Sequence, residues 1–158
     1  MEPIRVCVVA AFEPLRRGLA GSLRSSADMT VVGEASSLEQ LIGSETFRDA
    51  DVVVMDAATG EDVPARDAYA RINEWLPALR ILFLGSRDAG RSIDADDLPL
   101  YMRLNTVGFL VKDGPTARLL DAVRLIAGGA FVCETDVIRH ILTRLTHWAT
   151  EGEDTRGG

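Results

Sequence analysis

The sequence predicts a doubly wound α/β fold, in which a five-stranded parallel sheet is covered by helices on both faces. Two observations predict it. Short apolar runs rich in β-branched residues alternate with segments of helical spacing. The strongest runs are mostly apolar instead of alternating with polar residues, as is typical of strands buried on both faces of a parallel sheet. Each parallel connection also needs a crossover, usually a helix, to return the chain. The length of 158 residues suits one compact domain.

Five segments are predicted as strands. Four of them are strong, whereas the second in chain order gives a weaker signal. They are Ile4–Val9, Thr30–Val32, Val52–Met55, Ile81–Leu84 and Val107–Val111.

Helices are predicted in the segments between these strands. Pro14 stands where a first helical turn tolerates a missing N–H, and Leu15, Leu19 and Leu23 then follow along one face. Similar spacing predicts a second helix from Leu38, Leu41 and Ile42, a third from Ala68, Ile72 and Trp75, and a weaker fourth from Leu100, Met102 and Leu104.

Two further helices are predicted towards the C-terminus. Pro115 begins the fifth, and Gly128-Gly129 ends it where left-handed backbone geometry is needed. A sixth apolar stripe is surplus to a five-stranded fold and predicts an extra C-terminal helix. Its members are Val137, Ile138, Ile141, Leu142, Leu145 and Trp148. Residues 151–158 contain no apolar side chain, which predicts a flexible tail or linker.

The composition excludes several classes of function. The 17 basic residues are outnumbered by 24 acidic ones, and the net charge of −7 argues against direct binding of a nucleic-acid backbone. Cys7 and Cys133 lack the close spacing of a zinc or redox motif, and no signal peptide is evident, so we expect a cytoplasmic protein. The apolar runs are shorter than the ~18 residues that a membrane helix needs.

A candidate site is expected at the carboxyl ends of the strands, which converge on a crevice in open parallel sheets. Asp56 follows the third strand, and Lys112, the one lysine among 17 basic residues, follows the fifth. Together they would form an ion pair at the crevice. The carboxylate could be a nucleophile towards a phosphoryl group, a metal ligand or a structural partner of the lysine, and these alternatives stay open on the residues alone.

Four segments match a known pattern in the same order. Residues 8–19, VVAAFEPLRRGL, are similar to an opening strand and helix that usually reads V-D-D-x-P-L-x-R-x-G-L, and Val31–Ala35, Asp51–Asp56 and Gly108–Asp113 are similar to the second, third and fifth strands. They resemble the receiver domain of two-component response regulators of the NarL/FixJ class, whose output domain is a LuxR-type helix-turn-helix. The resemblance covers about residues 4 to 130 and extends into the sixth helix.

The resemblance implies a flavodoxin-like (CheY-like) fold and a role in controlling transcription. It implies a receiver domain at residues 1–130, a linker helix at 131–150, a tail at 151–158, and a DNA-binding domain that is absent from this chain. It also implies a homodimer that meets DNA only through that missing domain. Family dimers use either helices one and five or the face of helix four, strand five and helix five, and both remain open.

The functional interpretation depends on the positions at which this sequence differs from the family pattern. Asp56 occupies the position of the phosphate acceptor, but the two acidic residues that hold Mg²⁺ in the family are Ala10 and Ala11 here. A methyl group offers no oxygen ligand, so we expect Mg²⁺ affinity to collapse and no other cofactor to be needed. Gly85 replaces the hydroxyl residue on strand four, and Phe109 occupies the switch-aromatic position without a phenolic hydroxyl.

We therefore interpret the chain as an atypical receiver that is not an enzyme and works without Mg²⁺-dependent phosphorylation. Asp56 and Lys112 would persist as a structural pair, and a small ligand, a partner protein or protein concentration would control dimerisation. In the alternative, a histidine kinase still phosphorylates Asp56, and Glu13 supplies the missing cation ligand.

Overall fold

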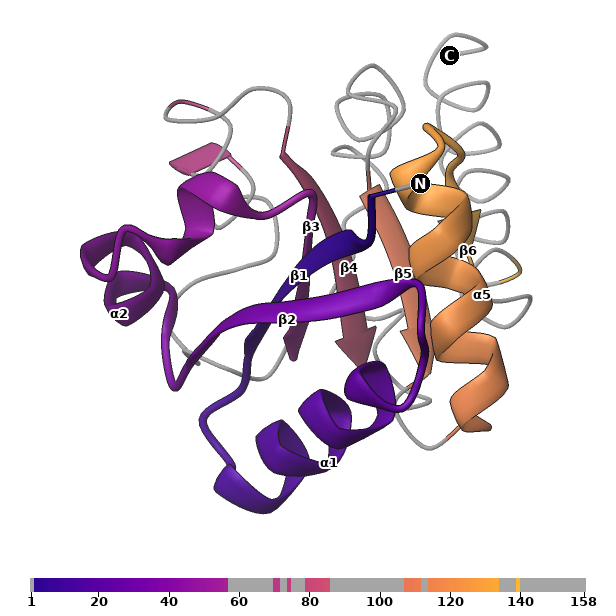
Figure 1. Cartoon of the computed structure of the whole chain (residues 1–158), viewed down its shortest axis with the longest axis horizontal. Coiled ribbons are helices and arrows are strands. Elements are labelled where there is room, and N and C mark those ends of the chain that lie inside the picture. The colour runs from indigo at the N-terminus through magenta and orange to yellow at the C-terminus, as the bar shows by residue number, and fades with distance from the viewer. Residues whose placement is uncertain are drawn as a thin grey trace, which may run out of the picture.

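A six-stranded parallel sheet forms the centre of the molecule, with strand order β2-β1-β3-β4-β5-β6 (Figure 1). The computed structural model describes residues 2–56, 70, 71, 74, 79–85, 107–111, 114–133 and 139. The strands are β1 (Ile4–Val9), β2 (Met29–Ala35), β3 (Val52–Asp56), β4 (Arg80–Gly85), β5 (Val107–Val111) and β6 (Val132–Cys133).

The sixth strand corrects the expected count of five. Val132 and Cys133, which we assigned to the C-terminal linker-helix segment, instead pair in parallel with Gly108 and Phe109 of β5. The pairing satisfies backbone groups along an edge of β5 that would otherwise need water. The five predicted strands are all present, so the doubly wound α/β fold is confirmed.

The helices flank this sheet on two sides. They are α1 (Glu13–Arg24), α2 (Leu38–Gly43), the 3₁₀ helix η1 (Thr46–Asp49) and α5 (Thr116–Ala127). Pro14 lies in the first turn of α1 as predicted. Ala70, Arg71 and Glu74 are helical within the predicted third helix, and Arg139 is helical within the predicted sixth. The predicted fourth helix and the tail at 151–158 lie outside the described residues.

Two buried clusters, one on each face of the sheet, form the core. The first lies beneath α2 and η1 and includes Leu41, Phe47 and Phe83. The second lies beneath α1 and α5 and includes Leu23 and Ile126. Figure 1 shows α2 at the left of the sheet, away from α1 and α5. None of the helices in the described part of the chain combines the length and the hydropathy of a membrane-spanning segment.

Close packing requires glycine at two strand positions. A Cβ added at Gly108 would lie 3.0 Å from Leu82 Cδ1 and 3.3 Å from the Val132 carbonyl oxygen, and closer still to Ile126 Cδ1. Gly33 follows an irregularity in β2, because Val6 pairs with Val31 whereas Cys7 pairs with Gly33. A Cβ there would lie 3.2 Å from Thr46 Cβ. Gly108 therefore allows α5 to approach the sheet, and Gly33 allows η1 to do so.

Polar contacts tie α5 to its neighbours. Arg124 Nε donates to Asp28 Oδ2 at 2.7 Å, and its Nη2 donates to Ser26 Oγ at 3.0 Å, which joins α5 to the loop between α1 and β2. Arg80 Nη1 at the start of β4 donates to the Ala127 carbonyl at the end of α5. Hydrogen bonds from Arg124 and then from Ser26 lower the pKa of Asp28 from 3.8 to about 2.

We expect this contact to give the folded state a measurable acid dependence. Because the folded pKa of Asp28 is depressed, the contact stabilises the fold above pH ~4 and is lost as pH falls towards 2. An Arg124→Ala variant should raise the Asp28 pKa towards ~4, as followed by NMR titration of the carboxyl carbon. Arg17→Ala, which removes an arginine on α1, is the control. An unchanged Asp28 pKa in Arg124→Ala would contradict the assignment.

Candidate functional site

The carboxyl edge of the sheet brings together three of the predicted site residues. Asp56 is the last residue of β3, is 5% exposed and pairs in register with Leu84, which Gly85 follows. On the other side of β3, Val9 pairs with Met55, so the next residue of each strand, Ala10 and Asp56, are neighbours. The Ala10 amide donates to the Ala35 carbonyl at 3.0 Å, which extends the β1–β2 ladder by one step. Asp56 therefore lies between Ala10 and Leu84, and Gly85 is the next residue along β4.

Phe109 belongs to the core cluster beneath α2 and η1, on the sheet face opposite to α1 and α5. Its ring stacks on that of Phe83 with centroids 5.7 Å apart, and the Phe131 ring meets its edge at 6.3 Å. Only 5% of Phe109 is exposed. The residue at the switch-aromatic position is thus a packing residue in this structure.

The predicted partner of Asp56, Lys112, lies outside the residues that the structure describes. Asp56 and Ala11 each have an interaction partner. The pairing of Asp56 with Lys112 stays a prediction.

Arg16, which the sequence did not single out, contacts the first of the two alanines. Ala10 is fully buried, and its carbonyl accepts a hydrogen bond from Arg16 Nη1 at 2.9 Å. The neighbouring Arg17 instead pairs with Glu13 at 2.8 Å on the outer surface of α1. The opening pattern has its arginine at the position of Arg16 and any residue at that of Arg17, but the contact itself depends on which way each side chain leaves the helix. Arg16 thereby joins α1 to the end of β1.

Glu13 is the candidate substitute ligand in the phosphorylation alternative. It is the first residue of α1, and its side chain is 56% exposed. Its ion pair with Arg17 spans one helical turn on the outside of the molecule. The Glu13 carboxylate is therefore engaged along the helix surface.

The described residues at this edge do not fit the Mg²⁺ site that the receiver pattern implies. Mg²⁺ is held by carboxylates and other oxygen ligands in near-octahedral geometry, and Ala10 and Ala11 offer only methyl groups. The Ala10 carbonyl oxygen already accepts from a guanidinium. In the described ranges, no three His, Cys, Asp or Glu side chains gather closely enough to hold a metal ion.

The chain is similar in sequence to regulatory proteins of bacteria. No protein-family model matches it. It is 29% identical to the transcriptional regulatory protein LiaR of Bacillus subtilis over 144 residues, which is 91% of this chain and 65% of LiaR. It is 27% identical to the response regulator protein VraR of Staphylococcus aureus over 146 residues, with 90% of this chain and 65% of VraR covered. The chain thus spans less than two thirds of both relatives.

Solved structures of response regulators have the same fold as this chain. A LuxR-family two-component response regulator from Aurantimonas sp. SI85-9A1 matches with a TM-score of 0.74 at 20% identity, over 92% of this chain and 99% of that one. The homologues of this chain include the response regulator VraR and the transcriptional regulatory protein LiaR. The signal receiver domain of NarL from Mycobacterium tuberculosis matches with a TM-score of 0.63 at 24% identity, over 82% of this chain and 99% of that domain. The flavodoxin-like receiver fold expected from the sequence is therefore confirmed.

The residues at the carboxyl edge can be compared with the positions of the receiver pattern. In the response-regulator pattern of the sequence, Asp56 stands at the phosphate-acceptor position, with Ala10 and Ala11 at the two acidic positions. The structure places Asp56 and Ala10 side by side on neighbouring strands. The first of the two departures, Ala10, thus lies next to the residue at the acceptor position.

Proposed function

We propose that this chain is the receiver domain of an atypical response regulator, and that it acts without Mg²⁺-dependent phosphorylation of Asp56. The observation that carries the proposal is the pair of alanines, Ala10 and Ala11, beside Asp56. Phosphoryl transfer to an aspartate relies on a divalent cation that neutralises the phosphoryl oxygens. Without oxygen ligands at these two positions, the cation has no adequate place to bind.

The same residues support a site that is stable without a cation. Carboxylates close to Asp56 would repel it, and two alanines remove that repulsion. Arg16 also fixes the end of β1 through the Ala10 carbonyl, at 2.9 Å. In this proposal Asp56 is a structural residue paired with Lys112, and the domain acts by binding rather than by catalysis.

The output of the domain is proposed to be dimer-dependent control of transcription. RcsB, a structural neighbour with a TM-score of 0.71 at 21% identity, forms dimers on DNA. The charge of −7 disfavours direct DNA contact by this chain, so a separate helix-turn-helix domain would carry it. Residues 1–130 would form the receiver, 131–150 the linker helix and 151–158 a tail. The dimer would assemble in the cytoplasm without prior phosphorylation.

A backbone NMR titration tests the proposal directly. Mg²⁺ is added first to ~10 mM, above the roughly 10⁻⁴–10⁻³ M dissociation constants of weak Ca²⁺ sites. Beryllofluoride, a mimic of the aspartyl phosphate, is added next. We expect the amide chemical shifts of Asp56, Gly85 and Ala10 to stay unchanged after both additions. Saturating shifts with both additions would overturn the proposal in favour of phosphorylation at Asp56. Loss of those shifts in Glu13→Gln would then identify Glu13 as the substitute ligand.

Replacing Arg16 tests what holds the end of β1 in place. Arg16→Ala removes a charged donor from a buried carbonyl and should lower the free energy of unfolding by ~1–3 kcal/mol. It should also speed amide hydrogen exchange at Ala11 and Phe12. Arg17→Ala is the matched control, because an exposed ion pair one helical turn long contributes little. Equal effects of the two substitutions, measured by urea denaturation, would show that the Ala10 contact is unimportant.

A further inference from the structure

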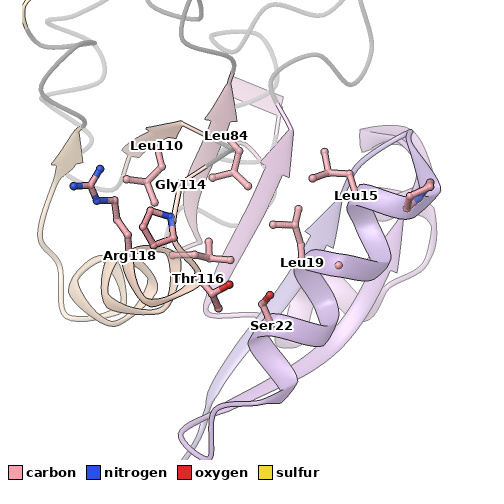
Figure 2. A pocket seen from close by; sticks show the side chains of 12 residues that line it. Leu15, Leu19, Ser22, Leu84, Leu110, Gly114, Thr116 and Arg118 are labelled. Atoms are coloured by element: carbon pink, nitrogen blue, oxygen red, sulfur yellow. The ribbon is translucent and has the colours of Figure 1, made fainter.

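A pocket lies between α1 and α5, on the sheet face that these two helices cover. Its volume is about 260 Å³, and it reaches down to Leu84 on β4 and Leu110 on β5. Figure 2 shows these two leucines behind the gap, with Leu15 and Leu19 directed into it from α1. The floor residues are themselves almost fully buried, at 1% and 6% exposed. The pocket is therefore a recess that extends inward to the sheet.

A glycine keeps the α1 side of the pocket open. Gly18 lines the pocket, and a Cβ added there would meet no atom within 4 Å. A glycine within a helix costs stability relative to alanine, and no close approach of backbone requires this one. Gly18 is exposed, and the space beside it at the pocket is open.

The rim adds polar groups to otherwise apolar walls. Ser22 on α1 and Thr116 on α5 place hydroxyl groups at the same end of the pocket (Figure 2). The Arg118 side chain forms part of the lining, but its guanidinium points away from Leu15 and Leu19. Among the described lining residues, the pocket therefore offers neutral hydrogen-bonding groups, and the guanidinium of Arg118 is directed away from the leucines of α1.

The pocket floor is connected to the candidate site through the sheet. Leu84 pairs in register with Asp56 on one side and with Leu110 on the other. By strand alternation, Asp56 follows Val54 onto the same sheet face as Leu84. A molecule seated on Leu84 and Leu110 would touch the residues next to Asp56.

We propose that this pocket binds a small, mainly apolar molecule that carries one neutral hydrogen-bonding group. The size supports this class of ligand. A cavity of about 150 Å³ lined by aliphatic and aromatic residues holds benzene, so 260 Å³ suits a molecule of about two rings, below the roughly 300–1,000 Å³ of drug-sized sites. The leucines would enclose the rings, while Ser22 or Thr116 would bond the polar group. The regulatory meaning of the ligand rests on the proposed phosphorylation-independent function, whereas its binding does not.

The test uses 2-naphthol as the probe and naphthalene as its counterpart without a hydroxyl. Backbone NMR shifts should saturate with 2-naphthol at Leu84, Leu110, Ser22 and Thr116, and naphthalene should bind more weakly. No Mg²⁺ or beryllofluoride is present, so the result is independent of the phosphorylation test. Absence of shifts at the two floor leucines would overturn the proposal.

Two glycines of α1 provide a matched pair of variants. Gly18→Leu fills the pocket, whereas Gly21→Leu adds the same side chain where a Cβ also meets nothing within 4 Å but outside the pocket lining. Both should fold at least as stably as the parent, because leucine favours a helix over glycine. We expect Gly18→Leu to weaken 2-naphthol binding by about tenfold or more, and Gly21→Leu to leave it unchanged.

Two other results would overturn the proposal. Equal weakening by both variants would place the probe elsewhere on α1. Pocket signals that move with protein concentration alone, and that 2-naphthol does not move further, would mean that a side chain from a second copy fills the pocket.

Discussion

The Ala10→Asp/Ala11→Asp variant should gain a Mg²⁺-dependent rise in thermal midpoint that the parent chain lacks. The two carboxylates would join Asp56 and supply the oxygen ligands that a divalent cation needs. With Mg²⁺ at about 100 times its Kd, binding to the folded state adds ~2.7 kcal/mol, or roughly 5–11 °C for a domain of this size. Differential scanning calorimetry with and without Mg²⁺ measures the rise.

The same variant should be less stable than the parent when Mg²⁺ is removed. Ala10 is fully buried, so an aspartate there brings a carboxylate out of water and close to Asp56. Ala11 is exposed, and Ala11→Asp alone should cost little and bind Mg²⁺ less tightly. A parent chain that shows the same Mg²⁺-dependent rise would contradict the proposed function, and a double variant without one would contradict the assignment of the two positions.

Gly108→Val should be the most damaging single substitution considered for the fold. The added side chain would press on Ile126 and Leu82, which are both 0% exposed and cannot move into solvent. Overpacking of this kind costs ~1–3 kcal/mol, and valine brings two carbons more than the Cβ that already clashes, so we expect the upper end of that range. Urea denaturation with an unchanged slope measures the loss.

Gly18→Ala is the control, because its Cβ enters open space. It should raise the free energy of unfolding by up to ~1 kcal/mol. Ile126→Val combined with Gly108→Ala should recover part of the loss seen in Gly108→Ala alone, as a double-mutant cycle would reveal. If Gly108→Val proved neutral, α5 would not pack against β5 as the structure has it.

The strands that could be predicted well are those buried on both faces. Ile4–Val9 and Val107–Val111 coincide with β1 and β5, because a short, mostly apolar run between helical segments is typical of a strand covered on both faces. β2 is longer than the predicted Thr30–Val32, since Gly33 and Glu34 interrupt the apolar run at the edge of the sheet. The two residues of β6 are too few to give any periodic signal, and only pairing with β5 defines them.

The location of the candidate site could be predicted from the sequence, whereas its side-chain contacts could not. Parallel strands carry their carboxyl ends to one edge, so Asp56, Ala10 and Gly85 could be placed together from the strand ends alone. The hydrogen bond from Arg16 depends on side-chain torsions that the sequence does not specify. The pocket depends on how two helices distant in sequence approach each other, and Gly18 by itself indicates only a weak helix former.

The irregularity of β2 affects how copies of this chain can associate. An edge strand with a regular ladder is a template for strand addition, which leads to amyloid-like growth or domain swapping. β2 shifts register between Val31 and Gly33, and Glu34 beyond them carries a charge paired with Arg24 at 3.1 Å. At the other edge, β6 has two residues. Both edges of the described sheet therefore discourage continuous β-pairing between molecules, and we expect any association between copies to use the helical surfaces.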